Sequence, residues 1–518
     1  MKPIRIIFAL ALAATSSVAL SAQTTLPEIF RDHMILQRQQ PIPVWGRANA
    51  GAAITVRLAD AQQTTTADKD GKWRVQLPAR EAGGPFILTV SAGSKTINIQ
   101  DVLLGDIWLA SGQSNMTMPM RSNMPWSMGV LDYEHEIASA NEKNVRFYLV
   151  PKEPDYPEQT EMHGIWRVSV GSQVCDVSAA SYYFARKLNH DTNIPIGVIV
   201  SGNGATGIES WVNMDVNRKY HPKKMEELDK LLHDHASELA EYERSRPGFE
   251  KQQNEYSNGC TSEKPHEQKP PIERFIFRQS ALYNAMIYPF HQVPIKGAIW
   301  YQGENDSGNY KEYANEIQDL IASWRASWHE PNMPFYMVQL ENVENDARRG
   351  LDPDPTRLHF TNFREMQRRT VQLVPHTGIA VSADVGDPYF PHPRNKRPVG
   401  ERLALLAEAN DYGLKVVASG PVLKSFSRSG DKLLLKFDAQ GGPLIVNTGT
   451  IPYGFEIAGA DKVYHPAVSA VDGDTVTLNS PLVKEPLNAR YGWRENPYLS
   501  LYNTADLPAS PFATDWQP

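Results

Sequence analysis

Four short polar motifs, each following an apolar run, carry the residue types that hydrolyse esters. The motifs are SGQSN (residues 111–115), SGNGATG (201–207), QGEND (302–306) and ADVGDPYFPHP (383–393). A serine hydroxyl is a weak nucleophile at neutral pH until a base takes its proton, and a histidine with a pKa near ~6.5 suits that task. We therefore expect Ser114 and His392 to meet, although each motif taken alone is also compatible with an ordinary turn.

The same motifs offer groups that stabilise a tetrahedral oxyanion. The backbone N–H of Ser114 at a strand-to-helix corner, the backbone of the glycine-rich loop 201–207 and the side-chain amide of Asn305 are hydrogen-bond donors of the required kind. Residues 383–393 also contain aspartates, and a carboxylate can orient an imidazole and stabilise its charged form. This combination predicts acyl transfer through a serine.

Several neighbouring side chains have two interpretations. Gln113 and Gln302 are candidates for substrate contact or for bracing the loops, and Glu209 and Trp211 are candidates for sugar contact or for a helix-start carboxylate and a packing indole. Trp493 and Tyr498 are open between sugar stacking and core packing. Histidines and cysteines show no metal-ligand spacing, so we expect neither a metal nor a cofactor.

Alternating strands and helices must position these motifs. From 101 to 415, short apolar strands alternate with helical stretches, which predicts an α/β domain with a mostly parallel sheet and helices on both faces. Residues 216–274 interrupt this rhythm and are expected to be an insertion. Period-two alternation in 23–100 predicts a β-sandwich or jelly-roll-like domain, and the same pattern in 416–518 predicts a second β domain.

The N-terminus and the overall charge restrict the cellular location and the classes of binding partner. Residues 1–22 have a basic start, an apolar run and a small-residue cleavage site, which predicts a signal peptide and a secreted, periplasmic or extracellular protein rather than a membrane span. The 518-residue chain has a formal charge of −7, which disfavours nucleic-acid binding. Cys175 and Cys260 either form a disulfide or remain two buried thiols.

The order Ser, Gly, Asn, Asp, His of these motifs resembles that of the SGNH hydrolases. The segments WLASGQSNM, WYQGEND, HPRNKRPVGERLA, RYGWRENPYLSLYNTADLPASPF and LPEIFRDHMILQRQQPIPVWG further resemble the sialate O-acetylesterase family over nearly the whole chain after residue 22. The resemblance implies an SGNH-hydrolase-like fold, with Ser114 as nucleophile and His392 as base. It also implies three oxyanion donors, which are Ser114, Gly204 and Asn305.

The sequence departs from that family in two places. Many relatives have an aspartate two residues before the histidine, where this chain has Phe390, so the orienting group is Asp387, Asp384 or a backbone carbonyl; we favour Asp387. The glycine loop also differs from the Trp-Gly-Gly-Thr-Pro of many relatives, although Gly204 is retained. This second departure concerns the fit of the substrate.

The resemblance implies a secreted carbohydrate O-acetylesterase that acts on an acetylated glycan. Two alternatives remain: a deacetylase of plant cell-wall oligosaccharides such as acetylated xyloglucan, and a non-catalytic carbohydrate-binding protein on a hydrolase fold. A sialate site needs a cation for the substrate carboxylate, and Arg394, Lys396 and Arg397 follow His392, although they also fit a solvated helix start. The sequence leaves the oligomeric state open.

Overall fold

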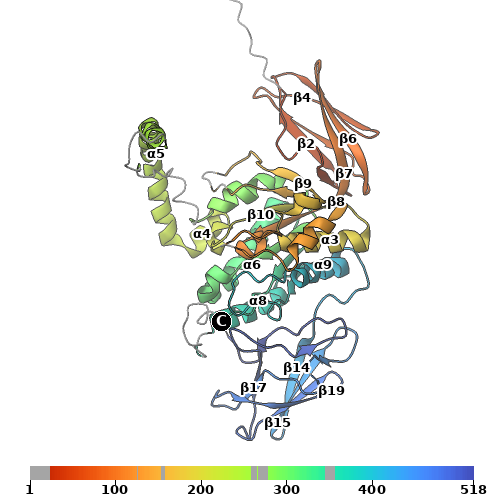
Figure 1. The fold of residues 1–518 in the computed structure, drawn as a ribbon, viewed down its shortest axis with the longest axis vertical. Coiled ribbons are helices and arrows are strands. Elements are labelled where there is room, and N and C mark those ends of the chain that lie inside the picture. The colour runs from red at the N-terminus through yellow and green to blue at the C-terminus, as the bar shows by residue number, and fades with distance from the viewer. Residues whose placement is uncertain are drawn as a thin grey trace, which may run out of the picture.

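A computed structural model describes residues 24–517 except 125–126, 153, 155–157, 258–264, 266–277, 345–355, 357 and 448. The predicted signal peptide of residues 1–22 and Cys260 therefore lie outside the described residues. Along the chain, an N-terminal β domain, a central α/β domain and a C-terminal β domain follow one another (Figure 1). This arrangement confirms the predicted fold class.

The N-terminal domain surrounds an apolar core. In its larger sheet β3 pairs with β4 and β6, and β6 and β1 pair with β7, while β2 and β5 form a separate antiparallel pair. The strands are β1 (Ile35–Gln37), β2 (Ile42–Arg47), β3 (Ala53–Leu58), β4 (Ala61–Thr66), β5 (Lys72–Leu77), β6 (Gly83–Ala92) and β7 (Lys95–Gly112). The alternating burial of β3 and β5 matches the period-two pattern of their sequences.

Strand β7 continues from this domain into the central sheet. Its first half pairs with β6, and its second half lies between β10 and β11, so the expected boundary at residue 101 falls inside one strand. The central order is β13-β12-β11-β7-β10-β8-β9, parallel apart from β9. Its other strands are β8 (Asn141–Leu149), β9 (Ile165–Val170), β10 (Ile196–Gly202), β11 (Gly297–Tyr301), β12 (Phe335–Val338) and β13 (Thr377–Ala380).

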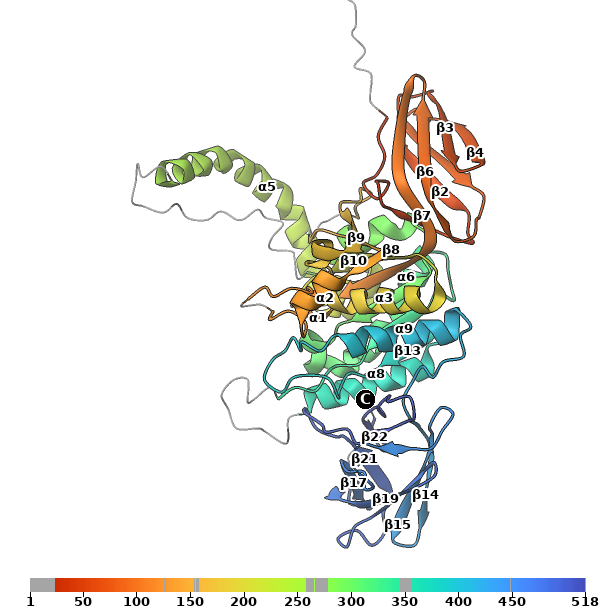
Figure 2. The same ribbon diagram turned by 45° about the vertical axis from the view of Figure 1, so that its right-hand side comes forward.

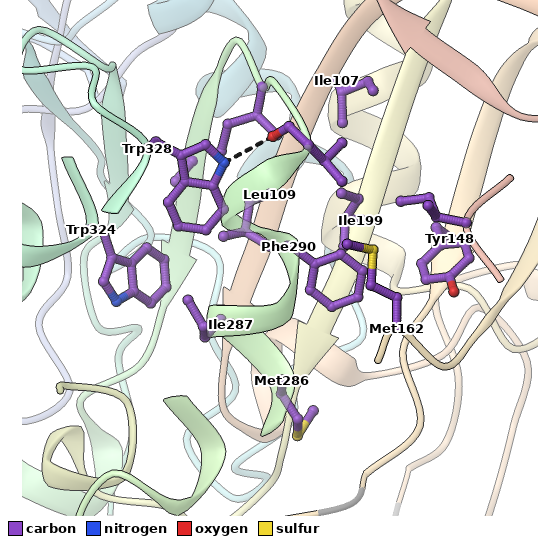
Figure 3. Packing of buried hydrophobic residues seen from close by; sticks show 14 of the residues in the cluster. Ile107, Leu109, Tyr148, Met162, Ile199, Met286, Ile287, Phe290, Trp324 and Trp328 are labelled. Atoms are coloured by element: carbon purple, nitrogen blue, oxygen red, sulfur yellow. Dashed lines mark hydrogen bonds between the residues drawn. The ribbon is translucent and has the colours of Figure 1, made fainter. Parts of the chain in front are cut away.

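Helices cover both faces of the central sheet because its middle strands are apolar on both sides. One face packs on α3 (Ala179–Thr192) and α9 (Arg397–Asp411), and the other on α6 (Tyr310–Ser327), α8 (His359–Leu373) and the short helices η4 (Tyr283–Ile287) and η5 (Tyr288–Gln292). Figure 3 shows this second core, where the Trp328 indole donates to Val293 O at 2.9 Å. The shorter helices are α1 (Ser114–Thr117), α2 (Tyr133–Ser139), η1 (Gly171–Val174), η2 (Ile208–Ser210) and η6 (Glu304–Asn309).

The insertion expected over 216–274 begins with helices. Helix α4 (Met214–Tyr220) lies on the body, and α5 (Pro222–Ser257) projects away from it (Figure 2). Met225 and Leu228 are buried at the base of α5, whereas Leu239 is 41% exposed farther along. The base of the helix is therefore packed and its distal part is solvated. Among the described residues, no helix is long and apolar enough to cross a membrane.

The C-terminal domain has its own apolar core. Its sheets have the orders β14-β15-β20-β19 and β18-β17-β21-β23, and β16 pairs with β22. The strands are β14 (Val422–Ser429), β15 (Lys432–Asp438), β16 (Ile445–Val446), β17 (Phe455–Ala458), β18 (His465–Pro466), β19 (Val468–Asp472), β20 (Thr475–Asn479), β21 (Asn488–Tyr491), β22 (Leu501–Tyr502) and β23 (Phe512–Ala513). The domain lies against the end of the α/β domain that carries α8 and α9 (Figure 2).

Candidate active site

Ser114 lies at a sharp turn where β7 leaves the sheet and α1 begins. Gly112 permits the turn because its φ is +140° and a Cβ there would lie 2.1 Å from Tyr301 O. The turn is held by the Gln113 N–H, which donates to the same carbonyl at 3.0 Å. Ser114 is half-buried and lies just after the end of β7, at the carboxyl edge of the sheet. Open α/β sheets bind ligands at this edge.

The glycine-rich loop after β10 lies directly against this turn. The Asn203 N–H donates to Gly112 O at 3.0 Å, which extends the pairing of the two strands. A Cβ added to Gly204 would lie 3.3 Å from Ser114 Cβ and 3.8 Å from Ser114 N. The structure thus brings Gly204 and the Ser114 backbone together, as an oxyanion pocket requires.

The loop after β11 is braced against both of these loops. Gln302 Nε2 donates to Gln113 Oε1 at 3.2 Å and to Thr206 O at 3.0 Å, and the Asn305 N–H approaches Gln113 Oε1 at 3.4 Å. Gln302 is fully buried and Gln113 is 4% exposed. Their burial supports the bracing interpretation over substrate contact, whereas the exposed Asn305 side chain remains accessible.

Asp306 connects the same loop to η2. Its Oδ2 accepts from Gln302 Nε2 at 2.5 Å and from the Ile208 N–H at 3.0 Å. Burial, with a smaller contribution from the charge of Glu209, raises the pKa of Asp306 to about 7. The connection between these loops therefore depends on a carboxyl group that changes its charge near neutral pH.

The loop that carries His392 is attached to the residue after the proposed nucleophile. Asn115 Nδ2 donates to Pro391 O at 3.0 Å, although the two residues are far apart in sequence. His392 is half-buried in this loop. One amide therefore joins the Ser114 turn to the His392 loop, whereas a contact between Ser114 and His392 themselves stays a prediction.

Charged groups beneath Ser114 converge on the same Asn115 side chain. Lys396 Nζ donates to Asn115 Oδ1 at 2.6 Å, and Asn115 Nδ2 approaches Glu304 Oε1 at 2.5 Å and Glu341 Oε1 at 3.1 Å. Tyr301 OH donates to Glu341 Oε2 at 3.0 Å. We call Asn115, Tyr301, Glu304, Glu341 and Lys396 the buried cluster.

The protonation of the buried cluster is shifted by its environment. Burial, reinforced by the neighbouring Glu341 carboxylate, raises the pKa of Glu304, and burial lowers the pKa of Lys396 to about 8. With one of the two glutamates protonated and the lysine charged, the cluster is electrically neutral. This neutrality allows these groups to stay away from water.

The candidate acids differ in their contacts. Asp384 forms a bidentate ion pair with Arg402, at 2.6 and 2.7 Å. Asp387 Oδ1 accepts from the N–H groups of Tyr389 at 2.8 Å and Phe390 at 3.1 Å, which stabilises the turn before His392. The Asp384 carboxylate is therefore held in an ion pair, whereas the Asp387 carboxylate stabilises a turn.

The sugar contact considered for Trp211 needs correction, whereas Trp493 follows its core-packing interpretation. Trp211 is fully buried, forms an edge-to-face contact with Trp300 at 6.0 Å and donates to Thr206 Oγ1 at 3.0 Å, so it packs in the core and offers no face to a sugar. Trp493 is only 7% exposed and also packs inside. Glu209 is half-buried and folds over Gly207, so its contact with sugar stays a prediction.

The basic residues after His392 are also engaged within the protein. Lys396 belongs to the buried cluster, Arg394 donates to Gly129 O at 3.2 Å and Val130 O at 3.1 Å, and Arg397 pairs with Glu136. The solvated helix start expected as an alternative is wrong for Lys396, which has no exposed surface. These contacts weaken the case for a carboxylate-binding cation in this segment.

Sequence reasoning missed Asn115 and Glu341 as parts of the site. Asn115 directly follows the nucleophile, and Glu341 lies three residues after β12, at the same carboxyl edge as the other loops. The polar run after an apolar strand was the available signal for Glu341. Among the described residues, no group of three His, Cys, Asp or Glu side chains is arranged to hold a metal ion.

Comparisons with known proteins show similarity to carbohydrate acetylesterases. A family model described as a carbohydrate esterase, sialic acid-specific acetylesterase, matches residues 270–404. A crystal structure of a carbohydrate acetylesterase from Xanthomonas citri has a TM-score of 0.79 and 35% sequence identity, covering 96% of this chain and 100% of that chain. The rat sialate O-acetylesterase is 28% identical over 93% of this chain and 92% of its own, and the human enzyme is 27% identical over 78% and 74%.

Proposed function

This chain belongs to the sialate O-acetylesterase family of carbohydrate acetylesterases, and from this membership we propose that it removes acetyl groups from sugars through a serine acyl-enzyme. The observation that carries the proposal is the meeting of three loops at one sheet edge. Gly204 lies against Ser114, and Asn115 joins that turn to the His392 loop. Ser114, Gly204 and Asn305 lie just after the ends of β7, β10 and β11, and His392 lies in the loop after β13, which supports their proposed roles as nucleophile, oxyanion donors and base.

In the proposed reaction the Ser114 hydroxyl attacks the acetyl carbonyl while His392 accepts its proton. The oxyanion receives hydrogen bonds from the N–H groups of Ser114 and Gly204 and from the Asn305 amide. His392 then gives the proton to the leaving sugar oxygen. Water, deprotonated by the same histidine, releases acetate and restores the serine.

We propose Asp387 as the group that orients His392. The bidentate ion pair with Arg402 occupies both oxygens of Asp384, whereas the turn around Asp387 uses its Oδ1. A carboxylate that stabilises the turn before the histidine is well placed to fix the position of the imidazole. The proposed export of the enzyme depends on the predicted signal peptide of residues 1–22.

A second candidate substrate is an acetylated plant cell-wall oligosaccharide instead of a sialate. The contacts of the basic residues after His392 favour it, because Lys396 is buried, Arg394 donates to two carbonyls, and the half-exposed Arg397 is paired with Glu136. Acetate release from O-acetylated sialic acid and from acetylated xyloglucan oligosaccharides, measured side by side, separates the two substrates.

The serine mechanism is tested by Ser114→Ala on an aryl acetate. We expect loss of nearly all activity with an unchanged melting temperature. The matched control is Ser111→Ala, because the buried Ser111 hydroxyl has no hydrogen-bond partner among the described residues and lies three residues before the nucleophile. Wild-type rates in Ser114→Ala would overturn the mechanism, and an inactive wild type would favour a non-catalytic carbohydrate-binding protein.

A further inference from the structure

Three exposed tyrosines lie in the His392 loop and in loops of the C-terminal domain. Tyr389 is 69% exposed, Tyr498 61% and Tyr453 44%. We propose that this tyrosine strip, Tyr389, Tyr453 and Tyr498, binds neutral sugar rings beyond the one that carries the acetyl group. The inference rests on the proposed function, because it extends that substrate site onto the C-terminal domain. Large aromatic surfaces left in water are typical of ligand-binding surfaces.

Tyr453 and Tyr498 form a stacked aromatic pair, which we call the platform. Their rings stack at a centroid distance of 5.4 Å with 26° between planes. The backbone of Tyr453 is fixed on both sides by Ser500, whose Oγ accepts from Tyr453 N–H at 2.9 Å and donates to Tyr453 O at 3.0 Å. The outer ring faces are therefore presented at little entropic cost, which favours stacking against the C–H face of a pyranose.

A buried arginine fastens the segment before Tyr498 to the catalytic domain. Arg364 on α8 is fully buried and donates to Leu340 O at 2.9 Å, Glu341 O at 2.7 Å and Arg494 O at 2.9 Å. It also donates to Glu495 O at 2.5 Å. One guanidinium thus joins the chain after β12 to the chain that leads to Tyr498, so the platform is fixed relative to the active site.

The chain after β12 also contacts the segment that leads to Tyr389. Asn342 accepts from the Gly386 N–H at 2.7 Å and donates to Asn496 Oδ1 at 2.9 Å. The Glu344 N–H donates to Pro388 O at 2.8 Å. These hydrogen bonds place residues 342–344 between the segment that leads to Tyr389 and the segment that leads to Tyr498.

The placement of Tyr389 links the strip to catalysis. It lies three residues before His392, in the turn stabilised by Asp387. A sugar whose acetyl group reaches Ser114 therefore has neighbouring rings near Tyr389 and then near Tyr498. The three phenol rings supply stacking surfaces and no cation, so the ligand class that we propose is a neutral glycan chain.

The inference is tested by Tyr389→Ala and Tyr498→Ala with two substrates. For acetylated xyloglucan oligosaccharides we expect KM to rise about three- to tenfold per variant, the usual loss for one aromatic contact. For an aryl acetate, which is too small to reach the strip, kcat/KM should stay within about twofold. Tyr498→Phe keeps the ring and should behave as the wild type.

The matched control is Phe426→Ala, because Phe426 is 43% exposed in the same domain but lies on β14 of the other sheet. An unchanged oligosaccharide KM in both alanine variants would refute the strip, as would an equal loss on both substrates. Binding of Ser114→Ala to xyloglucan in affinity electrophoresis, with and without Tyr498→Ala, tests the strip without turnover. If the wild type does not hydrolyse the aryl acetate, the proposed function fails. Even then, the strip is supported if xyloglucan retards the migration of the protein in the gel and the Tyr498→Ala substitution abolishes that retardation.

Discussion

Replacing Lys396 by methionine tests whether the buried cluster holds the active site together. Methionine keeps most of the side-chain volume but removes the ammonium that donates to Asn115 at 2.6 Å. Removing one partner of a buried charged group leaves the other unpaired and costs about 3–5 kcal/mol. We expect this loss of unfolding free energy at pH 7, where Lys396, with a pKa of about 8, is still mostly charged.

The loss should depend on pH. Without Lys396 no ammonium offsets a charge on Glu304, whose pKa is raised by burial, and keeping that carboxyl protonated costs less free energy in acid. The deficit should therefore shrink to about 1–2 kcal/mol at pH 5, close to the value of the lost hydrogen bond. Denaturant unfolding at the two pH values measures this difference.

Activity should fall as well, because Asn115 positions both the Ser114 turn and the His392 loop. A displacement of about 1 Å can cost roughly a hundredfold, so we expect kcat on an aryl acetate to fall about 10- to 100-fold with a small change in KM. Glu304→Gln added to Lys396→Met should restore part of the stability, because glutamine keeps an acceptor for Asn115 and removes a negative charge.

Two results would contradict this reasoning. A Lys396→Met variant within about 1 kcal/mol of the wild type at both pH values, with unchanged kcat, would show that the buried cluster neither stabilises nor positions the site. The control is Lys69→Met, whose side chain is 90% exposed, and it should change stability by no more than about 0.5 kcal/mol.

Four further substitutions test other parts of the site. The pKa of Asp306 is raised to about 7 from about 3.9 in the unfolded chain, so its protonated carboxyl favours folding below pH 4, and this stabilisation is lost as the pH rises to 7. In Asp306→Asn the unfolding free energy, measured by thermal unfolding, should fall by about 2–4 kcal/mol less over this pH range. A pH dependence parallel to that of the wild type would contradict this expectation. Gly204→Ala places a Cβ 3.3 Å from Ser114 Cβ and should lower kcat on an aryl acetate about 10- to 100-fold with little change in melting temperature, because the crowding displaces Ser114 from the oxyanion donors. Alanine keeps the backbone N–H, so a normal rate would show that the close packing of Gly204 on Ser114 does not position the site. Asp387→Asn should lower kcat by about 10²–10⁴, whereas Asp384→Asn should chiefly lower stability, and the reverse pattern in rate and unfolding assays would move the acid to Asp384.

Much of the architecture was readable from the sequence because the signals are local. Alternating apolar residues in β3 and β5, and fully apolar runs in β10 and β11, correspond to one-sided and two-sided burial. Parallel strands present their carboxyl ends at one edge, so the loops after β7, β10 and β11 had to meet there. Ser114, Gly204 and Asn305 could therefore be grouped from their positions along the chain alone.

Other features depend on contacts between distant segments. Lys396 and Asn115 are separated by 281 positions, and nothing near Lys396 in the sequence indicates that its ammonium is buried. The same holds for Trp211, whose packing against Trp300 and Thr206 decided between a sugar contact and a core residue. Local composition reports which residues are able to be buried, but it does not report which neighbours compensate a charge.

The sequence by itself determined the order of strands and turns, and with it the residues able to perform ester hydrolysis. Only the tertiary structure decided how those residues are supported: by a shared amide at Asn115, by neutral pairing in the buried cluster, and by Arg364, which joins the C-terminal domain to the catalytic edge. The physical reason is that a buried charge or hydrogen bond is stable only when partners from other segments satisfy it, and those partners are set by packing in three dimensions.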